Sequence, residues 1–230
     1  EMARHQYFSP GFIDAGRRFG WLGRRIHEEV ADRRRSPRDD VISVIANADV
    51  DVDGRQISAE EAEAMVLLVI GGGVDTTTAL TSAAFVHLGH DMELRARLLA
   101  EPALMREATE EFLRFYPPAR THARTVTRDI DFAGCPMRAG DRVLLSEASA
   151  CRDETAFPDA DQFVADRLPN RHVAFGMGLH RCPGSHLARI EFNEMVTAVL
   201  ERIPDYQLGE TIEYPNWAAI GGWAAIPVTF

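Results

Sequence analysis

A cysteine within a glycine-rich segment is the residue of this sequence best suited to chemistry. Residues 175–184 read FGMGLHRCPG, and Cys182 lies directly before a stretch with helical periodicity. Backbone N–H groups at the start of a helix favour negative charge, so a cysteine placed there tends to be a thiolate, the form that binds metals. Gly178 and Gly184 would let the backbone approach a flat ligand closely. The histidine and the arginine that precede the cysteine are suited to binding carboxylates.

The residues alone leave other interpretations open. An isolated cysteine is most often a small buried apolar side chain. A zinc site would need further ligands, and the candidates near Cys182 are His172, His180 and His186. Only one residue separates His180 from the cysteine and no second ligand pair follows, so the spacing departs from that of structural zinc sites. The acidic turn at residues 49–54 hints at calcium, but the closing glutamate of a calcium loop is missing.

A glycine triplet followed by an acid and hydroxyl groups forms a second candidate segment. Residues 71–77 read GGGVDTT inside a predicted helix. Each glycine in a helix costs about 1 kcal/mol relative to alanine, so this helix is expected to hold its backbone close to another group or to contain a local bulge. Asp75 and Thr76 are suited to delivering protons through water. Packing of helices through small residues is the alternative, and a phosphate-binding loop is disfavoured because no lysine follows the glycines.

A charged pair near the end of another predicted helix is the third candidate. Glu111 and Arg114 are three residues apart, so they lie on one helix face, and Pro117 follows shortly afterwards. Taken alone, such a pair indicates a surface ion pair that contributes little to stability.

The elements that must position these residues are mostly helices. Apolar residues recur at helical spacing, and Ser58 with Glu61 forms a capping box at the start of the longest helix. Short strands with turns are expected over 121–143, and loops with strands over 206–230. Because strands and helices do not alternate, no nucleotide-binding parallel sheet is expected, and the fold class is mainly α with small β-sheets, an α+β fold. Helices are expected over residues 21–35, 40–46, 58–89, 91–100, 102–116 and 183–203.

The last predicted helix directly follows the cysteine, so its placement matters for the first candidate segment. Pro183 is expected in its first turn, where a missing backbone N–H is tolerated. The helix is also expected to bury one apolar face. The residues expected on that face are Leu187, Ile190, Met195, Val199 and Leu200.

Composition and charge limit the classes of function. With 25 basic and 35 acidic residues among 230, the net charge of −10 argues against a nucleic-acid partner. Three cysteines without tight spacing argue against a disulfide framework and for a reduced, cytoplasmic setting. The start of the chain is not signal-like, and without a run of about 18 apolar residues no membrane-spanning helix is expected. A monomer is the default expectation.

Together, the three candidate segments resemble the cytochrome P450 family in order and spacing over about residues 20–230. The cysteine segment resembles the family signature F-x-x-G-x-[R/H]-x-C-x-G, and Glu111 with Arg114 resembles its E-x-x-R pair. Gly73, Asp75 and Thr76 resemble its oxygen-activating helix. The approach to the cysteine is also similar, through Arg152, Asp153, Phe157, Pro158, Asp159, Phe163 and Arg167.

This resemblance implies a single cytochrome P450 domain over residues 1–230, with the amino-terminal part of the family's fold missing or truncated. It implies that the Cys182 thiolate binds the iron of haem b and favours cleavage of the O–O bond. Asp75 and Thr76 would be the catalytic residues that deliver protons to dioxygen at the haem. The residues implied to bind the cofactor are Gly72, His122, Arg124, Phe175, Gly176, His180, Cys182 and Gly184.

Within that set, the resemblance implies distinct roles. Arg124 and His180 would hold the haem propionates, with His122 beside them, and Phe175 would pack near the sulfur. The E-x-x-R pair would brace the segment below the haem, joined by Arg152 or Arg167. Walls of a substrate pocket are expected from Gly72, Gly73, residues 119–121 and residues 219–220.

The implied activity is that of a soluble bacterial haem-thiolate monooxygenase, which inserts one oxygen atom from O2 into a small, apolar organic substrate. Electrons would come from NAD(P)H through a ferredoxin or flavoprotein. Arg181 and Arg189 near the cysteine are candidates for docking an acidic partner. The alternative is a truncated module that binds haem or a hydrophobic ligand without turnover.

Overall fold

The computed structural model of the chain describes residues 10–50, 54–214 and 220–230. Residues 1–9, the centre of the acidic turn considered for calcium (51–53) and Ala219 of the expected pocket wall lie outside the described residues. The chain groups into two compact units, the first ending at Val74 and the second beginning at Asp75. One long helix, α3 (Ala59–His90), belongs to both. The expectation of a single domain over the whole chain stays a prediction.

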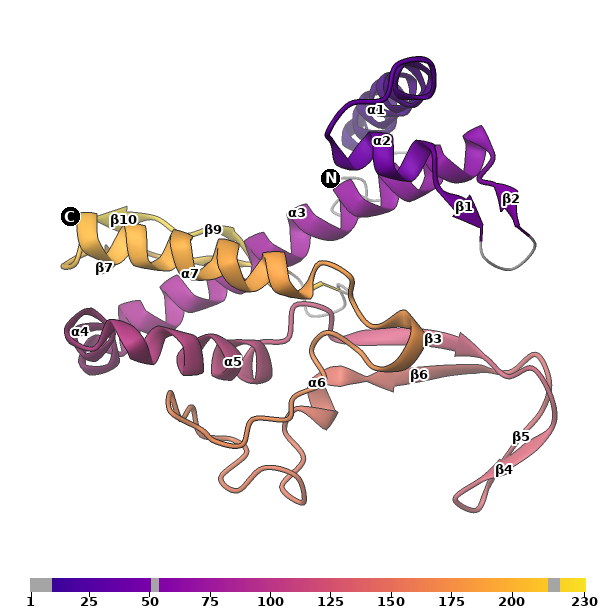
Figure 1. Cartoon of the computed structure of the whole chain (residues 1–230). Helices are drawn as coiled ribbons and strands as arrows, with labels where there is room; N and C mark the ends of the chain where they lie inside the picture. Colours follow the sequence, from indigo (N-terminus) through magenta and orange to yellow (C-terminus); the bar gives the residue numbers. More distant parts are fainter. Residues whose placement is uncertain (1–9, 51–53, 215–219) are drawn as a thin grey trace. The chain divides into compact units, whose positions relative to one another are not determined.

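The first unit is built from helices and one short hairpin. α1 (Pro10–Arg35) packs against α2 (Val41–Ala46), and β1 (Asp49–Val50) pairs with β2 (Arg55–Gln56) before α3 begins (Figure 1). α2 begins after Asp40, whose carboxylate accepts a hydrogen bond from the Ser43 N–H at 2.7 Å. The core of this unit consists of Ile26, Val30, Ile45, Ala46, Ile57, Ala62 and Val66.

α3 starts at the predicted capping box. The Ser58 hydroxyl accepts a hydrogen bond from the Glu61 N–H at 3.1 Å, and the Ser58 N–H donates to the Glu61 carboxylate at 2.8 Å. The helix stays α-helical through the glycine triplet at 71–73, so the local bulge considered for this segment is wrong. Its second half is largely buried, whereas Leu68 and Val69 in the first half are exposed.

By length and composition alone, α3 is apolar enough to cross a membrane. A search for an uninterrupted apolar run misses this because glycines, threonines and Asp75 interrupt the helix. One helix of this kind is weak evidence, since core helices of soluble proteins pass the same test. The expectation that no helix spans a membrane therefore stays a prediction.

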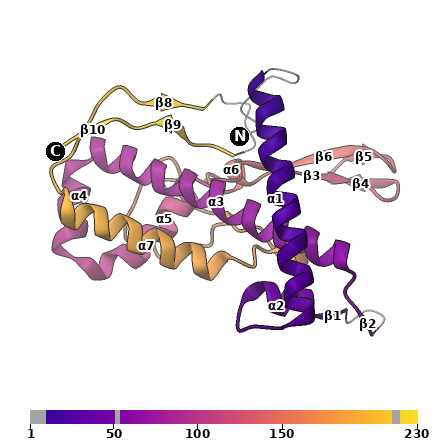
Figure 2. The same ribbon diagram turned by 90° about the horizontal axis from the view of Figure 1, so that it is seen from above.

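The second unit has a helical core. The second half of α3, α4 (Met92–Ala100), α5 (Met105–Phe115) and α7 (Ser185–Arg202) all contribute to it (Figures 1 and 2). Leu88 of α3, Phe112 of α5 and Phe192 of α7 are fully buried. Asp91 caps α4 by accepting a hydrogen bond from the Leu94 N–H at 2.9 Å. A 3₁₀ turn (Pro102–Leu104) precedes α5, so the helix predicted over 102–116 has two parts.

The apolar face predicted for the last helix is correct at Leu200 but wrong at Leu187, Ile190 and Met195. α7 buries the row Phe192, Val196 and Leu200, at a spacing of four residues. Leu187 and Ile190 are instead 58% and 60% exposed, and Met195 is exposed as well. Sequence apolarity does not distinguish the buried face of this helix from the exposed one. Pro183 also lies outside the helix, which begins at Ser185.

The described strands form small, two-stranded antiparallel sheets. β3 (Thr121–Thr125) pairs with β6 (Arg142–Ser146), and the hairpin of β4 (Ile130–Phe132) and β5 (Cys135–Met137) extends this ribbon (Figure 1). Near the carboxyl end, β7 (Gln207–Leu208) pairs with β10 (Val228–Thr229), and β8 (Ile212–Glu213) with β9 (Trp223–Ala225). A short helix, α6 (Glu147–Ala150), follows β6. The fold class, mainly α with small β-sheets, is confirmed.

Candidate functional site

The loop that carries Cys182 is shaped by backbone turns. The Cys182 N–H donates to the Phe175 carbonyl at 2.8 Å, which closes the loop on itself. Gly176 and Gly178 have φ values of +67° and +69°, in the left-handed region that glycine favours. A 3₁₀ turn (Gly178–His180) leads to the cysteine, and Gly184 precedes the first residue of α7. Glycine at positions 176 and 178 therefore follows from local geometry.

The thiol of Cys182 is free and partly exposed. The tip of the loop carries exposed apolar and basic side chains, namely Met177, Leu179, His180 and Arg181. No segment among the described residues covers them. None of the three cysteines forms a disulfide, as predicted.

The zinc interpretation of this loop is wrong. Across the described residues, no group of three or more His, Cys, Asp and Glu side chains could hold a metal ion. His172, one of the candidate ligands, is bound elsewhere, since its Nε2 lies 3.0 Å from the Glu110 carboxylate. Cys182 is also not fully buried, which argues against a role as a small core side chain alone.

Two of the predicted cofactor-binding residues lie on one face of β3. His122 and Arg124 are two residues apart in the strand, so their side chains project to the same side of the ribbon. Arg124 is exposed and donates to the neighbouring Ala123 carbonyl at 2.9 Å. His122 is held by Glu147, with 2.7 Å between its Nδ1 and the carboxylate. Glu147 was missed by sequence reasoning because 25 residues separate it from His122 and no motif links them.

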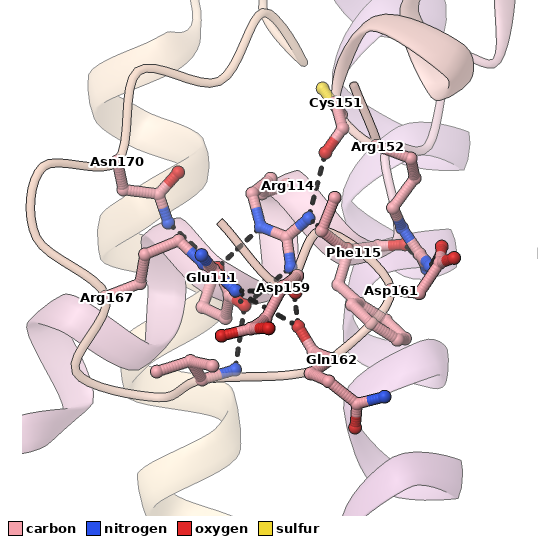
Figure 3. A network of polar contacts seen from close by, with 12 residues as sticks. Glu111, Arg114, Phe115, Cys151, Arg152, Asp159, Asp161, Gln162, Arg167 and Asn170 are labelled. Atoms are coloured by element: carbon pink, nitrogen blue, oxygen red, sulfur yellow. Dashed lines mark hydrogen bonds and ion pairs between the residues drawn. The ribbon is translucent and has the colours of Figure 1, made fainter. Parts of the chain in front are cut away.

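The Glu111–Arg114 pair lies in the core of the second unit. Both side chains are 0% exposed, and the guanidinium donates to the two carboxylate oxygens at 2.8 and 2.7 Å (Figure 3). The remaining Arg114 donors bind the carbonyls of Cys151, Ala160 and Gln162 at 2.7–2.9 Å. The interpretation as a surface ion pair is therefore wrong, because α5 folds against the irregular segment 151–170 and encloses the pair.

A second arginine joins the same carboxylate. Arg167 donates through Nε to Glu111 at 3.1 and 3.2 Å, and the Asn170 amide donates at 3.0 Å (Figure 3). Burial alone would raise the pKa of Glu111, but the hydrogen bonds from Arg114, the Val164 N–H and Arg167 outweigh it and hold this pKa below its usual value. Of the two arginines expected to join the pair, Arg167 does so directly, whereas Arg152 donates to the Phe115 carbonyl at 2.8 Å.

The glycine triplet and the two residues implied to be catalytic lie along α3. Apart from neighbouring residues and the nearby backbone of α3 itself, no described atom lies within 4 Å of a Cβ built on Gly71, Gly72 or Gly73. The close approach expected at these glycines stays a prediction. In the second unit, Asp75 is exposed and Thr76 is half-buried at the start of that unit's part of α3. Their catalytic role stays a prediction.

The two segments expected to form pocket walls are brought together. Ala119 and Ile220 form an isolated antiparallel bridge, and the Gly221 N–H donates to the Pro118 carbonyl at 3.0 Å. Arg120, the polar residue of the first segment, lies 3.7 Å from the Glu213 carboxylate.

The basic residues near the cysteine differ in their availability to a partner. Arg181 is exposed. Arg189 instead donates to both oxygens of the Glu110 carboxylate at 2.6 and 2.7 Å. Docking of an acidic partner by Arg181 and Arg189 stays a prediction, with the Arg189 cation already paired to Glu110.

Comparison with known proteins identifies the class to which this fold and this cysteine loop belong. The family model described as Cytochrome P450 matches residues 22–203, and the chain belongs to the cytochrome P450 family. It is 38% identical over 203 residues to a steroid C26-monooxygenase of Mycolicibacterium smegmatis, covering 87% of the chain and 50% of that protein. It is 33% identical over 218 residues to cytochrome P450-terp of Pseudomonas sp, covering 90% of the chain and 50% of that protein.

Solved structures agree with this assignment. CYP109E1 from Bacillus megaterium in complex with testosterone has a TM-score of 0.84 at 32% identity, covering 91% of this chain and 58% of that one. CYP109B1 from Bacillus subtilis has a TM-score of 0.86 at 30% identity, covering 100% of this chain and 63% of that one. The chain thus spans about half the length of the curated relatives that it matches.

The side chains around Cys182 suit the haem that this family implies. A thiolate ligand for iron requires a cysteine outside any disulfide, which Cys182 provides. A Cβ built on Gly184 would lie 3.8 Å from the Cys182 sulfur, so the backbone before α7 passes close to that atom. Haem carboxylates require cationic or hydrogen-bonding partners, and His180 in the loop and Arg124 on β3 are both exposed. The donor set therefore fits haem.

Proposed function

We propose that the protein to which this chain belongs is a haem-thiolate monooxygenase that oxidises a small, apolar organic substrate. The observation that carries the proposal is the free, partly exposed thiol of Cys182, on a loop turned by glycines and placed directly before α7. Relatives named steroid C26-monooxygenase and mycinamicin IV hydroxylase/epoxidase support a reaction of this type. We further propose a cytoplasmic monomer that receives electrons from NAD(P)H through a ferredoxin or flavoprotein.

The residues near the loop then have distinct proposed roles in binding haem. Haem, when bound, supplies activation of O2, with one oxygen atom inserted into the substrate and the other released as water at the expense of two electrons and two protons. Cys182 Sγ binds the iron as a thiolate. Arg124 and His180 hold the carboxylates, and His122 assists through the nitrogen not bound to Glu147. The remaining proposed contacts to the cofactor are Phe175, Gly176 and Gly184, together with Gly72.

Asp75 and Thr76 have the proposed task of moving protons. The Asp75 carboxyl takes up a proton from solvent, which its exposed position allows. The Thr76 hydroxyl donates a proton onward to the reacting oxygen and is replenished by the acid through water. The Glu111 and Arg114 side chains have no exposed surface, and their proposed task is structural, to brace the segment below the haem.

The visible spectrum of the purified chain tests the ligand. With haem bound, reduced and exposed to carbon monoxide, the chain is expected to show the strongly red-shifted Soret band of thiolate-ligated haem. Cys182→Ser should abolish this band, whereas Cys135→Ser, which changes an exposed cysteine on β5, should retain it. A band that survives Cys182→Ser contradicts the proposal, as does a lack of haem binding both by this chain and by a longer product of its gene.

Turnover separates the monooxygenase from the alternative, a binding module without turnover. With an electron donor present, Thr76→Ala is expected to divert electrons from substrate to hydrogen peroxide, because the proton supply at the reacting oxygen is impaired. Thr78→Ala serves as the control, because Thr78 lies two residues further along the same helix and is exposed. Absence of electron consumption, or a ratio of oxidised substrate to hydrogen peroxide that Thr76→Ala leaves unchanged, favours the binding module.

A further inference from the structure

Arg189 of α7 contacts three separate segments around the cysteine loop. Its Nε and Nη2 donate to the Glu110 carboxylate of α5 at 2.6 and 2.7 Å. Its Nη1 donates to the Ser185 carbonyl at 2.9 Å, in the first turn of α7. Its guanidinium carbon lies 4.6 Å from the centre of the Phe175 ring, within range of a cation–π contact. One side chain thus joins α5, the start of α7 and the loop.

His172 also contacts Phe175 and Glu110, and so joins this cluster. Its side chain is only 4% exposed, and its ring centre lies 6.0 Å from that of Phe175. The His172 Nδ1 accepts a hydrogen bond from the Ala174 N–H at 3.2 Å, so the Nε2 carries the proton that is donated to Glu110 at 3.0 Å. Glu110 therefore binds both groups that contact the Phe175 ring.

The cluster is coupled to Cys182 through the backbone and through charge. The Phe175 carbonyl accepts the hydrogen bond from the Cys182 N–H, so a shift of Phe175 moves the cysteine. The bond to Glu110 raises the pKa of Arg189, partial burial opposes this, and the charge of Cys182 adds a smaller increase. Burial works to raise the pKa of Glu110, but its bonds from Arg189 and His172 hold this pKa at about 2. Glu110 is therefore an anion and Arg189 a cation.

We propose that Glu110 and Arg189 are positioning residues that fix the Phe175 ring and set the electrostatic potential at the Cys182 sulfur. This inference rests on the proposed function only in taking that sulfur as the iron ligand. Because Arg189 is 25% exposed and Glu110 is 28% exposed, water screens the pair only in part. Removal of either charge leaves the other one uncompensated beside the loop.

The sign of the effect distinguishes this role from simple structural support. Glu110→Gln leaves the arginine cation and makes the potential at Cys182 more positive. Arg189→Gln leaves the glutamate anion and makes it more negative. The double variant is neutral again and should return toward the wild type. Loss of packing alone would instead change any property of the thiol in the same direction in both single variants.

Thiol chemistry of the haem-free chain provides the first readout. In a Cys135→Ser background, Cys182 is the accessible thiol, because Cys151 is fully buried. At fixed pH, we compare its rate constant with dianionic 5,5′-dithiobis(2-nitrobenzoate) with that for uncharged 4,4′-dithiodipyridine. The ratio of anionic to neutral rates should rise about threefold in Glu110→Gln and fall about threefold in Arg189→Gln, as expected for one charge nearby in a partly screened site. Arg202→Gln, exposed in the same helix, is the matched control.

A second variant guards against loss of folding. If Arg189→Gln fails to fold by circular dichroism, Arg189→Lys retains the cation without the planar donor pair. It should keep the ratio near the wild-type value while loosening the loop, seen as faster reaction with both reagents. Equal changes in the ratio for both single Gln variants, or no change in either, would overturn the proposal.

The haem-bound protein provides the second readout. The reduction potential of the iron should rise in Glu110→Gln and fall in Arg189→Gln, because a positive potential favours the reduced state. If neither this chain nor a longer product of its gene binds haem, the proposed function fails while the thiol rates still decide the inference. If a thiolate-ligated spectrum is present but the thiol-rate ratio is unchanged in both single variants, the inference alone fails.

Discussion

Arg114 uses every hydrogen-bond donor of its side chain. Its Nε, both Nη1 hydrogens and both Nη2 hydrogens bind Glu111 and three backbone carbonyls from the irregular segment 151–162. An arginine side chain has five such donors in a planar fork, which a lysine lacks. The guanidinium therefore replaces the backbone pairing that a regular strand or helix would supply, and a segment without secondary structure obtains a fixed path.

Replacing Arg114 is expected to destabilise the chain strongly. Arg114→Met leaves Glu111 buried with one partner lost and removes the donor from three carbonyls, of which only that of Gln162 keeps another donor among the described residues, Arg167. Loss of one partner of a buried pair costs about 3–5 kcal/mol. The free energy of unfolding, from urea titrations of the haem-free chain, measures this loss. Arg114→Lys should recover only part of it.

The matched control is an exposed arginine in a similar pair. Arg97 donates to Asp166 at 2.9 Å from a largely solvated position. Exposed pairs contribute little, so Arg97→Met should cost much less stability than Arg114→Met. Equal losses of unfolding free energy in the two variants would show that the buried network stabilises the chain no more than an exposed ion pair does.

The three cysteines should differ in reactivity. Burial raises the pKa of the Cys151 thiol, and its side chain has no exposed surface. Cys135 is exposed and Cys182 is partly exposed. A native haem-free chain is therefore expected to take up two equivalents of an alkylating reagent and a third only in denaturant, counted by mass spectrometry. Rapid labelling of Cys151 in the native chain would disprove this.

At the scale of the element, two glycines of α3 should respond oppositely to the same substitution. A Cβ on Gly89 would lie 2.4 Å from Leu208 Cδ1 and 2.5 Å from its Cγ, so Gly89→Ala should cost about 1–3 kcal/mol through overpacking. A Cβ on Gly73 meets no described atom within 4 Å, so Gly73→Ala should stabilise the helix by about 0.5–1 kcal/mol. Thermal unfolding of both variants measures the difference, and a shared sign would contradict it.

His87 gives α3 a dependence on pH. It packs among Phe112, Phe163 and Tyr116, whose hydroxyl lies 2.9 Å from Nδ1, and burial lowers its pKa below the ordinary value of 6.5. As the pH falls below about 6.5, the unfolded state therefore binds a proton that the folded state does not, and stability decreases.

Urea titrations at several pH values measure this effect. His87→Phe should flatten the decline in stability between about pH 7 and 5.5, since the ring stays apolar at every pH. His90→Gln, at an exposed position of the same helix, is the control. An unchanged decline in His87→Phe would assign the pH dependence to other groups.

Local sequence patterns predicted the secondary-structure elements better than the tertiary contacts that these elements make. The capping box at Ser58 and the order of the helices are visible in short stretches of sequence, and so is the glycine-turned cysteine loop. The buried face of α7 was predicted correctly only at Leu200, because Leu187 and Phe192 are both apolar and only tertiary packing separates them. The burial of Glu111 and the contact between Glu147 and His122 depend on segments far apart in the chain, which spacing does not reveal.

At the scale of the whole molecule, apolar surface is exposed on two helices. Leu187 and Ile190 of α7 and Leu68 and Val69 of α3 are all more than half exposed. The 230-residue chain alone is therefore expected to bind an apolar dye such as 8-anilinonaphthalene-1-sulfonate in its folded state. The double variant Leu187→Glu/Ile190→Glu should bind less dye with little change in unfolding temperature. Dye binding that appears only on unfolding would contradict the exposure of these faces.

The continuity of α3 across the boundary between Val74 and Asp75 has a consequence for how the chain opens. Helical hydrogen bonds form cooperatively, so a break within the helix is cheapest where intrinsic propensity is lowest, at residues 71–73. Amide hydrogen exchange should accordingly show a local minimum of protection there, flanked by slower exchange on both sides. The glycine triplet would then act as a hinge point at which one unit loses order while the other retains its own hydrophobic core.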